Sequence, residues 1–284
     1  MEETNEEQLT PGCAGKLKRL KQLLRDTGGC VVAYSGGVDS SLLLTVAVEV
    51  LGPKCLAAIA TSSTYPRREY EAAVSWVKDR NIPHVVIVSE ELDIPEFVNN
   101  PPERCYYCKR ELFAKVREQA DAHGLPHIAH GANADDDNDF RPGMRAGIEL
   151  GALAPLKAAG LSKADIRTIA REVYDLPVAD KPAMACLSSR FPYGSSITRE
   201  KLRQVEAVEN YLVDRGLRVV RARHHGEVLR IELGPEEMLL MQQSDIRAGC
   251  IGFAKQQGFV YVTLDLEGFR SGSMNEVLES RLVI

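Results

Sequence analysis

The chain has 284 residues, of which 44% are hydrophobic and 26% charged, a composition typical of a soluble globular protein rather than a disordered or fibrous one. Its length exceeds that of one average domain, so we expect a larger domain with a smaller one appended. The net charge of −5 gives no general attraction to nucleic acid, and no apolar run approaches the roughly 20 residues of a membrane span. Residues 1–10 are acidic and polar, unlike an export signal. We therefore expect a cytoplasmic protein with no nucleic-acid partner and no membrane partner.

The first residues of the chain predict a disordered segment followed by a helix. Residues 1–13 are rich in glutamate and contain a Thr10-Pro11-Gly12 break, so we expect them to be disordered. Leucines then recur at helical spacing from Leu17 to Leu24, which predicts an amphipathic helix. The apolar run at 30–33 follows and predicts a strand.

A glycine-containing loop at 35–41 joins this strand to an apolar run that predicts a helix. Paired glycines let the backbone approach an anion, and a helix start offers free N–H groups and a positive dipole end. The loop is not a Walker A motif, because no lysine follows the glycines. We predict a phosphate site, and a glycine-rich turn without a ligand is the alternative. The candidate contacts are Ser35, Gly36, Gly37, Asp39, Ser40 and Ser41.

Strands and helices then alternate, which predicts an α/β domain with a parallel sheet covered on both faces. Strands are expected at 55–60, 84–88 and 127–130, and helices at 67–80, 106–123 and 162–175. Ligands of such sheets bind at the carboxyl ends of the strands. We therefore expect the chemistry in the loops 35–41, 61–63, 89–104 and 131–143, with Thr61 as a further nucleotide contact. The carboxylates of the last loop, Asp136 among them, are candidate Mg²⁺ ligands, and a solvated acidic loop is the alternative.

From Thr198 the pattern changes to a compact α+β module of about 90 residues. Helices are expected at 198–215 and 235–257, and strands at 219–224, 228–233 and 259–264. We assign 14–195 to the first domain and 196–284 to a second domain for substrate binding and oligomerisation, and we expect a homo-oligomer. Arg221 and Arg223 share one strand face and suit a phosphate or carboxylate, although an exposed charged face explains the spacing equally well. His224 and His225 point to opposite faces, and we expect both at the surface.

Three of the seven cysteines lie where packing does not explain them. Cys105 and Cys108 are three apart at an expected helix start, where both thiolates share a face and the helix dipole favours them. Cys186 lies in a loop punctuated by glycine and proline. Three cysteines suit an iron–sulfur cluster with one open iron position, and a single reactive Cys186 is the competing interpretation. We expect Cys30, Cys55 and Cys250 in the core.

Four segments carry a resemblance to a known family. They are Ser-Gly-Gly-Val-Asp-Ser at 35–40, Asn-Ala-Asp-Asp at 133–136 with Asp-Phe-Arg-Pro-Gly at 139–143, Cys-Leu-Ser-Ser-Arg-Phe-Pro-Tyr-Gly at 186–194, and 261–272 with its Gly-Phe-Arg-Ser-Gly. The first resembles the PP-loop of ATP pyrophosphatases, which binds the β- and γ-phosphates of ATP. Together they resemble the LarE family over nearly the whole chain after residue 13.

The resemblance implies a PP-loop domain of the adenine nucleotide alpha hydrolase type and an ATP-dependent sulfurtransferase of nickel-pincer nucleotide synthesis. The substrate would be pyridinium-3,5-biscarboxylic acid mononucleotide, whose carboxylates are adenylated, with loss of pyrophosphate, and then become thiocarboxylates as AMP leaves. Some members sacrifice the sulfur of the cysteine matching Cys186, whereas others carry three cysteines and a 4Fe-4S cluster. Cys105 and Cys108 place this sequence with the second kind, for which the sulfur donor is unknown.

The resemblance also assigns roles to single residues. Arg221 and Arg223 would bind the substrate phosphate, and Glu209 would be a metal or substrate ligand. Asp39, as part of the phosphate loop, would act in AMP transfer. We expect Lys109 and Arg190 to balance negative charge that develops near the acyl group.

Two rival enzyme classes share the loop. A tRNA thiolation enzyme often has three cysteines, but the acidic balance and the absence of an obvious RNA module disfavour it. An amide synthetase of the NAD or GMP synthetase type would use ammonia and would need none of the cysteines. A protein that only senses nucleotide would release no pyrophosphate.

Overall fold

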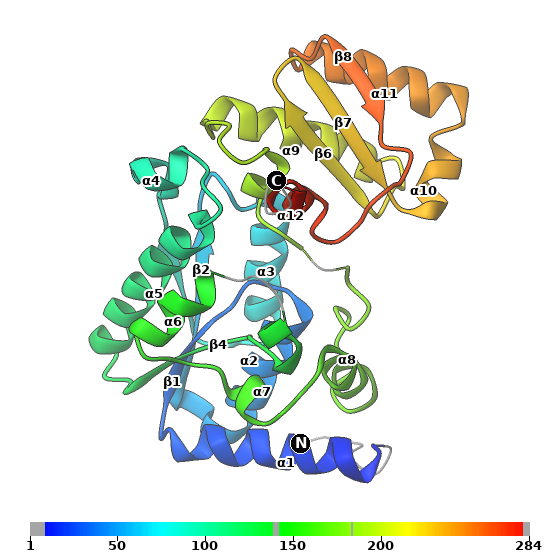
Figure 1. Cartoon of the computed structure of the whole chain (residues 1–284). Coiled ribbons are helices and arrows are strands. Elements are labelled where there is room, and N and C mark those ends of the chain that lie inside the picture. Colours follow the sequence, from blue (N-terminus) through cyan, green and yellow to red (C-terminus); the bar gives the residue numbers. More distant parts are fainter. Residues whose placement is uncertain (1–8, 139–141, 183, 281–284) are drawn as a thin grey trace. The chain divides into compact units, whose positions relative to one another are not determined.

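The computed structural model describes residues 9–138, 142–182 and 184–280, and the chain divides into two compact units (Figure 1). The first unit contains Met1–Glu91 and Glu103–Met184, and the second contains Leu92–Pro102 and Ala185–Ile284. The sequence placed the boundary after residue 195, whereas the chain enters the second unit after Met184, so Cys186 lies in the second unit. None of the described helices combines the length and apolar character needed to cross a bilayer.

The first unit is built on a five-stranded parallel sheet. Its strands are β1 (Cys30–Ala33), β2 (Cys55–Thr61), β3 (His84–Val88), β4 (His127–His130) and β5 (Ala152–Leu153), in the order β3-β2-β1-β4-β5. The predicted α/β parallel sheet is confirmed. Because β1 lies in the middle, the loop that follows it opens at the centre of the carboxyl edge.

Helices cover both faces of this sheet. One face carries α1 (Pro11–Asp26), α2 (Val38–Leu51), α3 (Arg67–Asp79), α7 (Pro155–Ala158) and α8 (Lys163–Glu172). The other carries α5 (Arg104–Ala122), against which α6 (Gly143–Glu149) packs. The short helices η2 (Gly52–Lys54), η3 (Glu91–Asp93) and η4 (Ala134–Asn138) lie in the connections. Alternate residues of β1 and β2 face the two helical layers, as a strand period of two requires.

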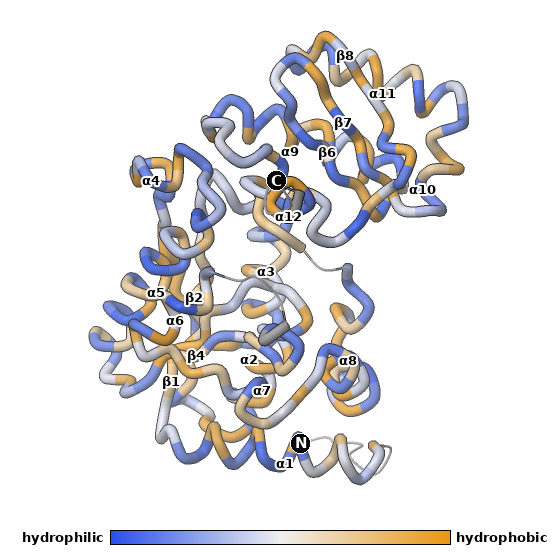
Figure 2. The backbone as a smooth tube through the Cα atoms, in the orientation of Figure 1, coloured by the Kyte–Doolittle hydropathy of each residue, from blue (hydrophilic) through white to orange (hydrophobic). Residues whose placement is uncertain are grey.

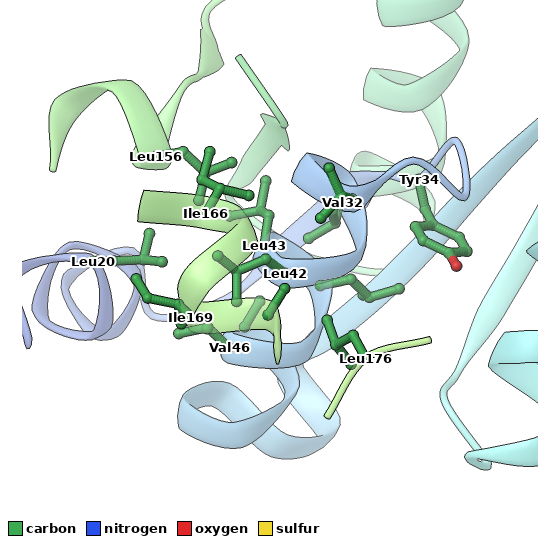
Figure 3. Packing of buried hydrophobic residues seen from close by; sticks show 14 of the residues in the cluster. Leu20, Val32, Tyr34, Leu42, Leu43, Val46, Leu156, Ile166, Ile169 and Leu176 are labelled. Atoms are coloured by element: carbon green, nitrogen blue, oxygen red, sulfur yellow. The ribbon is translucent and has the colours of Figure 1, made fainter. Parts of the chain in front are cut away.

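Helix α8 is fixed against α2 by buried aliphatic side chains. Ile166 and Ile169 of α8 and Leu42, Leu43 and Val46 of α2 are all 0% exposed and belong to one core cluster (Figure 3). Burying each such side chain stabilises the fold by about 1.5–3 kcal/mol. Hydrophilic and hydrophobic residues both occur along α8 (Figure 2). The polar side of this helix faces away from the core.

The start of α1 differs from the prediction. Pro11 occupies the first helical position, and the side chain of Thr10 accepts a hydrogen bond from the backbone N–H of Cys13. Proline is well suited to a first helical turn, because the N–H that it lacks has no intrahelical partner there. Residues 11–13 are therefore helical where the sequence predicted disorder, and residues 1–8 lie outside the described part of the chain.

The second unit has a three-stranded sheet in the order β6-β7-β8, formed by β6 (Val220–His225), β7 (Val228–Leu233) and β8 (Tyr261–Leu264). β6 pairs antiparallel with β7, and β8 pairs parallel with β7. The helices are α4 (Pro95–Val98), η5 (Leu187–Arg190), α9 (Arg199–Val213), α10 (Pro235–Leu240), α11 (Ser244–Gln256), η6 (Ser273–Asn275) and α12 (Glu276–Ser280). The predicted smaller α+β unit is confirmed.

The single helix predicted at 235–257 is wrong. The chain forms α10 and α11 instead, separated by Gln243 in an extended conformation with ψ 130°. Ser244 and Asp245 follow directly, and such short polar residues favour helix starts over helix interiors. The apolar pattern continues through the break, so periodicity alone does not reveal it.

Candidate functional site

The loop after β1 has the geometry of an anion site. It opens α2, whose N-cap is Gly37, and no side chain caps this helix start. Ser35 is exposed, whereas Ser40 and Ser41 are buried. The hydroxyl of Ser40 donates to the carbonyl oxygen of Gly37 at 3.1 Å and accepts from the backbone N–H of Ser35 at 3.2 Å. The loop is therefore held from within, while its backbone N–H groups at the start of α2 are left for a ligand.

Two glycines allow this close packing. Gly36 has a φ of +67°, and a Cβ at this position would lie 3.2 Å from the Cβ of Ala73. A Cβ at Gly131, in the loop after β4, would lie 3.0 Å from the backbone nitrogen of Ser40. The loops after β1 and β4 thus touch through glycine backbone, as the predicted ligand edge requires.

Asp39 lies at the centre of a polar network in the first unit. Its carboxylate accepts from the side-chain amide of Asn133 at 3.2 Å and is paired with the ammonium group of Lys163 at the start of α8. The backbone N–H of Lys163 in turn donates to Asp135 at 2.7 Å. The network joins the phosphate loop, the loop after β4 and α8.

A second lysine contacts the loop at Gly36. The Nζ of Lys181 donates to the carbonyl oxygen of Gly36 at 3.4 Å and is paired with Glu69 of α3. Sequence reasoning missed both Lys163 and Lys181. Their carboxylate partners are 124 and 112 residues away in the chain, so no local pattern marks them.

The other candidates of the first unit are placed as follows. Thr61 ends β2, and its carbonyl oxygen accepts from the backbone N–H of Ser89 at 2.9 Å. Asp136 is 7% exposed, and its carboxylate accepts from the backbone N–H of Asn133 at 3.0 Å, so it stabilises the turn at the start of η4. Its role as a Mg²⁺ ligand stays a prediction. Residues 139–141 of the expected motif lie outside the described residues.

Cys105 and Cys108 are the second and fifth residues of α5, at the helix start, as predicted. Cys105 is exposed and Cys108 is half-buried, and the thiol of Cys108 donates to the buried carboxylate of Glu91 at 3.6 Å. Lys109 follows them and is exposed. It lies close enough to His130, at the end of β4, to help lower the pKa of that imidazole to about 4, although burial is the larger cause.

In the second unit, Arg190 organises the loop that contains Cys186. Its guanidinium is 1% exposed, and its Nε and Nη2 each donate to Glu209 at 2.9 Å. Its Nη1 donates to the carbonyl oxygens of Ala185 at 2.8 Å and Cys186 at 3.1 Å. Burial is the largest single effect and lowers the pKa of Arg190, but the charge and hydrogen bonds of Glu209, together with the charges of Cys186 and Glu232, outweigh it, so the pKa is raised. Cys186 itself is half-buried beside this cation.

Arg221 and Arg223 face the same side of β6, opposite Glu232 and Arg230 of β7. Arg223 is 4% exposed and donates to Glu232 at 2.6 Å and to the carbonyl oxygen of Ser189 at 3.0 Å. Burial and the nearby cation of Arg190 lower the pKa of Arg221 to about 10. The shared face is confirmed, and its burial excludes an exposed charged surface.

His224 was expected at the surface, and this prediction is wrong. Its side chain is 6% exposed and lies between the rings of Phe191 and Phe259, with centroid distances of 5.4 and 5.1 Å. Strand alternation puts His224 and His225 on opposite faces, and α9 covers the face of His224, where Gln204 contacts it at 3.1 Å. His225 is exposed, as predicted.

The structure confirms the three expected core cysteines and corrects the expectation for Cys13, which was placed in a disordered segment. Cys30 and Cys55 are 0% exposed and Cys250 is 2% exposed, which confirms them as core residues. Cys13 is buried too, so Cys105, Cys108 and Cys186 are the three that solvent reaches. Within residues 9–138, 142–182 and 184–280, no three His, Cys, Asp or Glu side chains gather as a metal site. Cys186 belongs to the second unit and the other two to the first, so the three-cysteine cluster stays a prediction.

Comparison with known proteins decides the family. No family model matches the chain. It is 36% identical over 270 residues to the pyridinium-3,5-bisthiocarboxylic acid mononucleotide synthase of Lactiplantibacillus plantarum, covering 93% of this chain and 95% of that one. The chain belongs to the LarE family.

Two further relatives have no described function. An uncharacterised protein of Synechocystis is 41% identical over 263 residues, which is 93% of this chain and 98% of that one. An uncharacterised protein of Methanocaldococcus jannaschii is 28% identical over 259 residues, with coverages of 90% and 98%. The LarE similarity thus extends over both units.

Proposed function

We propose that this LarE-family chain is an ATP-dependent sulfurtransferase that converts the carboxylates of pyridinium-3,5-biscarboxylic acid mononucleotide to thiocarboxylates. The observation that carries the proposal is the 36% identity, over nearly both full lengths, to a protein named as the synthase of the bisthiocarboxylic acid mononucleotide. The parallel sheet with its glycine loop and the arginine cluster of the second unit support it.

The chemistry requires an activating nucleotide. A carboxylate reacts poorly with sulfur nucleophiles, because its leaving group would be an oxide or hydroxide. Transfer of AMP to the carboxylate oxygen, with loss of pyrophosphate, provides a good leaving group. The loop from Ser35 to Ser41 and the start of α2 would bind the leaving phosphates, and Asp39 in the first turn of α2 would hold Mg²⁺ beside them.

The second unit offers a site for the substrate phosphate. Arg221 and Arg223 share one face of β6, where burial and the nearby cation of Arg190 lower the pKa of Arg221. The Nε of Arg223 is buried, and no acceptor among the described residues bonds to it. A phosphate would supply this acceptor. Glu209 is engaged by Arg190 and by the backbone N–H of Ala222 at 2.9 Å, so it holds the loop of Cys186 in this arrangement.

The three solvent-accessible cysteines are the ligands that we propose for an iron–sulfur group. Cys105 and Cys108 lie one turn apart at the dipole-stabilised start of a 19-residue helix, and Cys186 is held beside the cation of Arg190. When bound, a 4Fe-4S cluster with one open iron position would supply the sulfide that displaces AMP. Lys109 and Arg190 would balance the negative charge of that displacement. A single-use transfer of the Cys186 sulfur is the alternative.

The test combines metal content with pyrophosphate release. Protein purified without oxygen should hold about four irons and four sulfides per chain, and alanine at Cys105, Cys108 or Cys186 should remove them. Alanine at the buried Cys250 is the matched control and should keep them. Pyrophosphate should be released from ATP when the biscarboxylate mononucleotide is added. Release that follows added tRNA instead would favour a tRNA thiolation enzyme, and no release with either would overturn the proposal. The cytoplasmic location and the homo-oligomer stay predictions, and the sequence names no sulfur donor.

A further inference from the structure

Two lysines that no motif marks contact the phosphate loop, at Asp39 and at Gly36. Lys163 pairs with Asp39, and Lys181 pairs with Glu69. We propose that both ammonium groups bind the β- and γ-phosphates of ATP, and that the two carboxylates hold them in place until the nucleotide arrives. This inference rests on the proposed use of ATP and names the cations of that site.

Lys163 lies next to the position expected for the phosphates. Asp39 is the second residue of α2, and the start of a helix that follows a strand and glycine loop is where an anion binds. The Nζ of Lys163 is one hydrogen bond from this carboxylate. A phosphate at the helix start would therefore lie within reach of a flexible lysine side chain.

Lys181 contacts the loop at a second residue, Gly36. Its Nζ contacts the carbonyl oxygen of Gly36, the residue whose left-handed conformation shapes the loop. The side chains of Lys181 and Glu69 are 25% and 18% exposed, so the pair is neither sealed in the core nor fully hydrated. A cation in this setting can exchange partners at modest desolvation cost.

One helix places both cations. Lys163 and Arg167 lie one turn apart on α8, and Arg167 donates to the carbonyl oxygen of Lys181 itself at 2.9 Å. α8 is in turn fixed against α2 by Ile166 and Ile169 (Figure 3). The core packing thus holds Lys163 directly, and Lys181 through Arg167, at the same end of α2.

The charges around the loop favour an exchange in which the two lysines leave their carboxylates and pair with phosphates. Without nucleotide, two ammonium groups and two carboxylates balance each other around the loop. Each lysine then faces a single carboxylate, whereas a polyphosphate offers several charged oxygens at the positive end of a helix. Binding of ATP with Mg²⁺ would draw both lysines to the phosphates and free Asp39 for the metal.

The experiment is calorimetric titration of the whole chain with ATP and Mg²⁺, with AMP as comparator. Lys163→Met and Lys181→Met should each weaken ATP binding about 10- to 100-fold, the usual loss for a hydrogen bond to a charged group, and leave AMP binding unchanged. Lys16→Met is the matched control, because Lys16 forms a similarly exposed pair with Asp165 of α8 at 2.7 Å. It should leave ATP binding unchanged.

Glu69→Gln separates this role from a structural one. It frees Lys181, so ATP binding should become several-fold tighter while Lys181→Met makes it weaker. A pair that only supports the fold would weaken binding in both variants, and that result would overturn the inference, as would equal losses for ATP and AMP. If the wild-type chain binds no ATP, the proposed function fails with it. If the wild type binds ATP and both lysine variants bind equally well, the inference fails alone.

Discussion

The buried pair of Arg190 and Glu209 gives the sharpest stability prediction. Arg190 is 1% exposed and the Glu209 side chain 13%, and two hydrogen bonds of 2.9 Å join them. Arg190→Met leaves the carboxylate of Glu209 in the interior without its cation. Breaking a buried pair in this way costs about 3–5 kcal/mol of unfolding free energy. The carbonyl oxygens of Ala185 and Cys186 lose their donor as well.

Thermal unfolding followed by circular dichroism measures this loss. A cost of about 3 kcal/mol lowers the Tm by roughly 6 °C or more in a chain of this size. Arg67→Met is the control, since Arg67 pairs with Glu71 at 2.7 Å with side chains 82% and 57% exposed. Such an exposed pair contributes about 0.3–0.5 kcal/mol. An Arg190→Met protein that melts no lower than the Arg67→Met protein would refute the reasoning.

A double variant tests whether the unpaired carboxylate of Glu209 causes the loss of stability in Arg190→Met. If the cost comes from the unpaired carboxylate, Glu209→Gln should destabilise the Arg190→Met protein much less than it destabilises the wild type. Residues in direct contact typically show coupling of about 0.5–3 kcal/mol. Strict additivity of the two changes would mean that the loop, not the ion pair, determines the loss.

Three further predictions concern the first unit. Burial, with Lys109 and Lys157, lowers the pKa of His130 from 6.5 to about 4, so between these values the unfolded chain binds a proton that the folded one does not. The unfolding free energy should fall by up to about 3 kcal/mol as pH drops through this range, and urea unfolding of His130→Gln should lack this fall. Gly15→Ala should raise the free energy of unfolding by about 0.5–1 kcal/mol, and the Tm with it. Gly15 is an exposed helix position, and a Cβ added there would meet no atom within 4 Å. Asp39→Ala should abolish pyrophosphate release with an unchanged circular dichroism spectrum, and unimpaired release would remove Asp39 from the site.

The sequence predicts those parts of the fold that depend on local pattern. The strand, glycine loop and helix at 30–51 follow from an apolar run, paired glycines and a second apolar run. The start of α8 follows from Ser162 and Asp165, whose side chains each accept from the other's backbone N–H. In these cases the residues that determine the structure are near neighbours in the chain.

Contacts between residues that are distant in the chain cannot be predicted from local sequence pattern. The pairing of Lys163 with Asp39 depends on the packing of α8 against α2, and neither lysine differs in its local context from a surface lysine. His224 was misplaced for a related reason. Strand alternation gives the relative orientation of two neighbours, but α9 decides which of them is covered.

The arginine face of β6 shows what burial adds to spacing. Spacing could not distinguish a substrate site from a solvated surface, because both place Arg221 and Arg223 on one side. In the structure Arg223 is 4% and Glu232 0% exposed. A buried ion pair commonly adds no stability over apolar residues of similar size, so stability alone does not account for these charges. The buried Nε of Arg223 has no acceptor among the described residues, and a bound anion would supply one. The cost of burying these charges is therefore best explained by a ligand that carries negative charge.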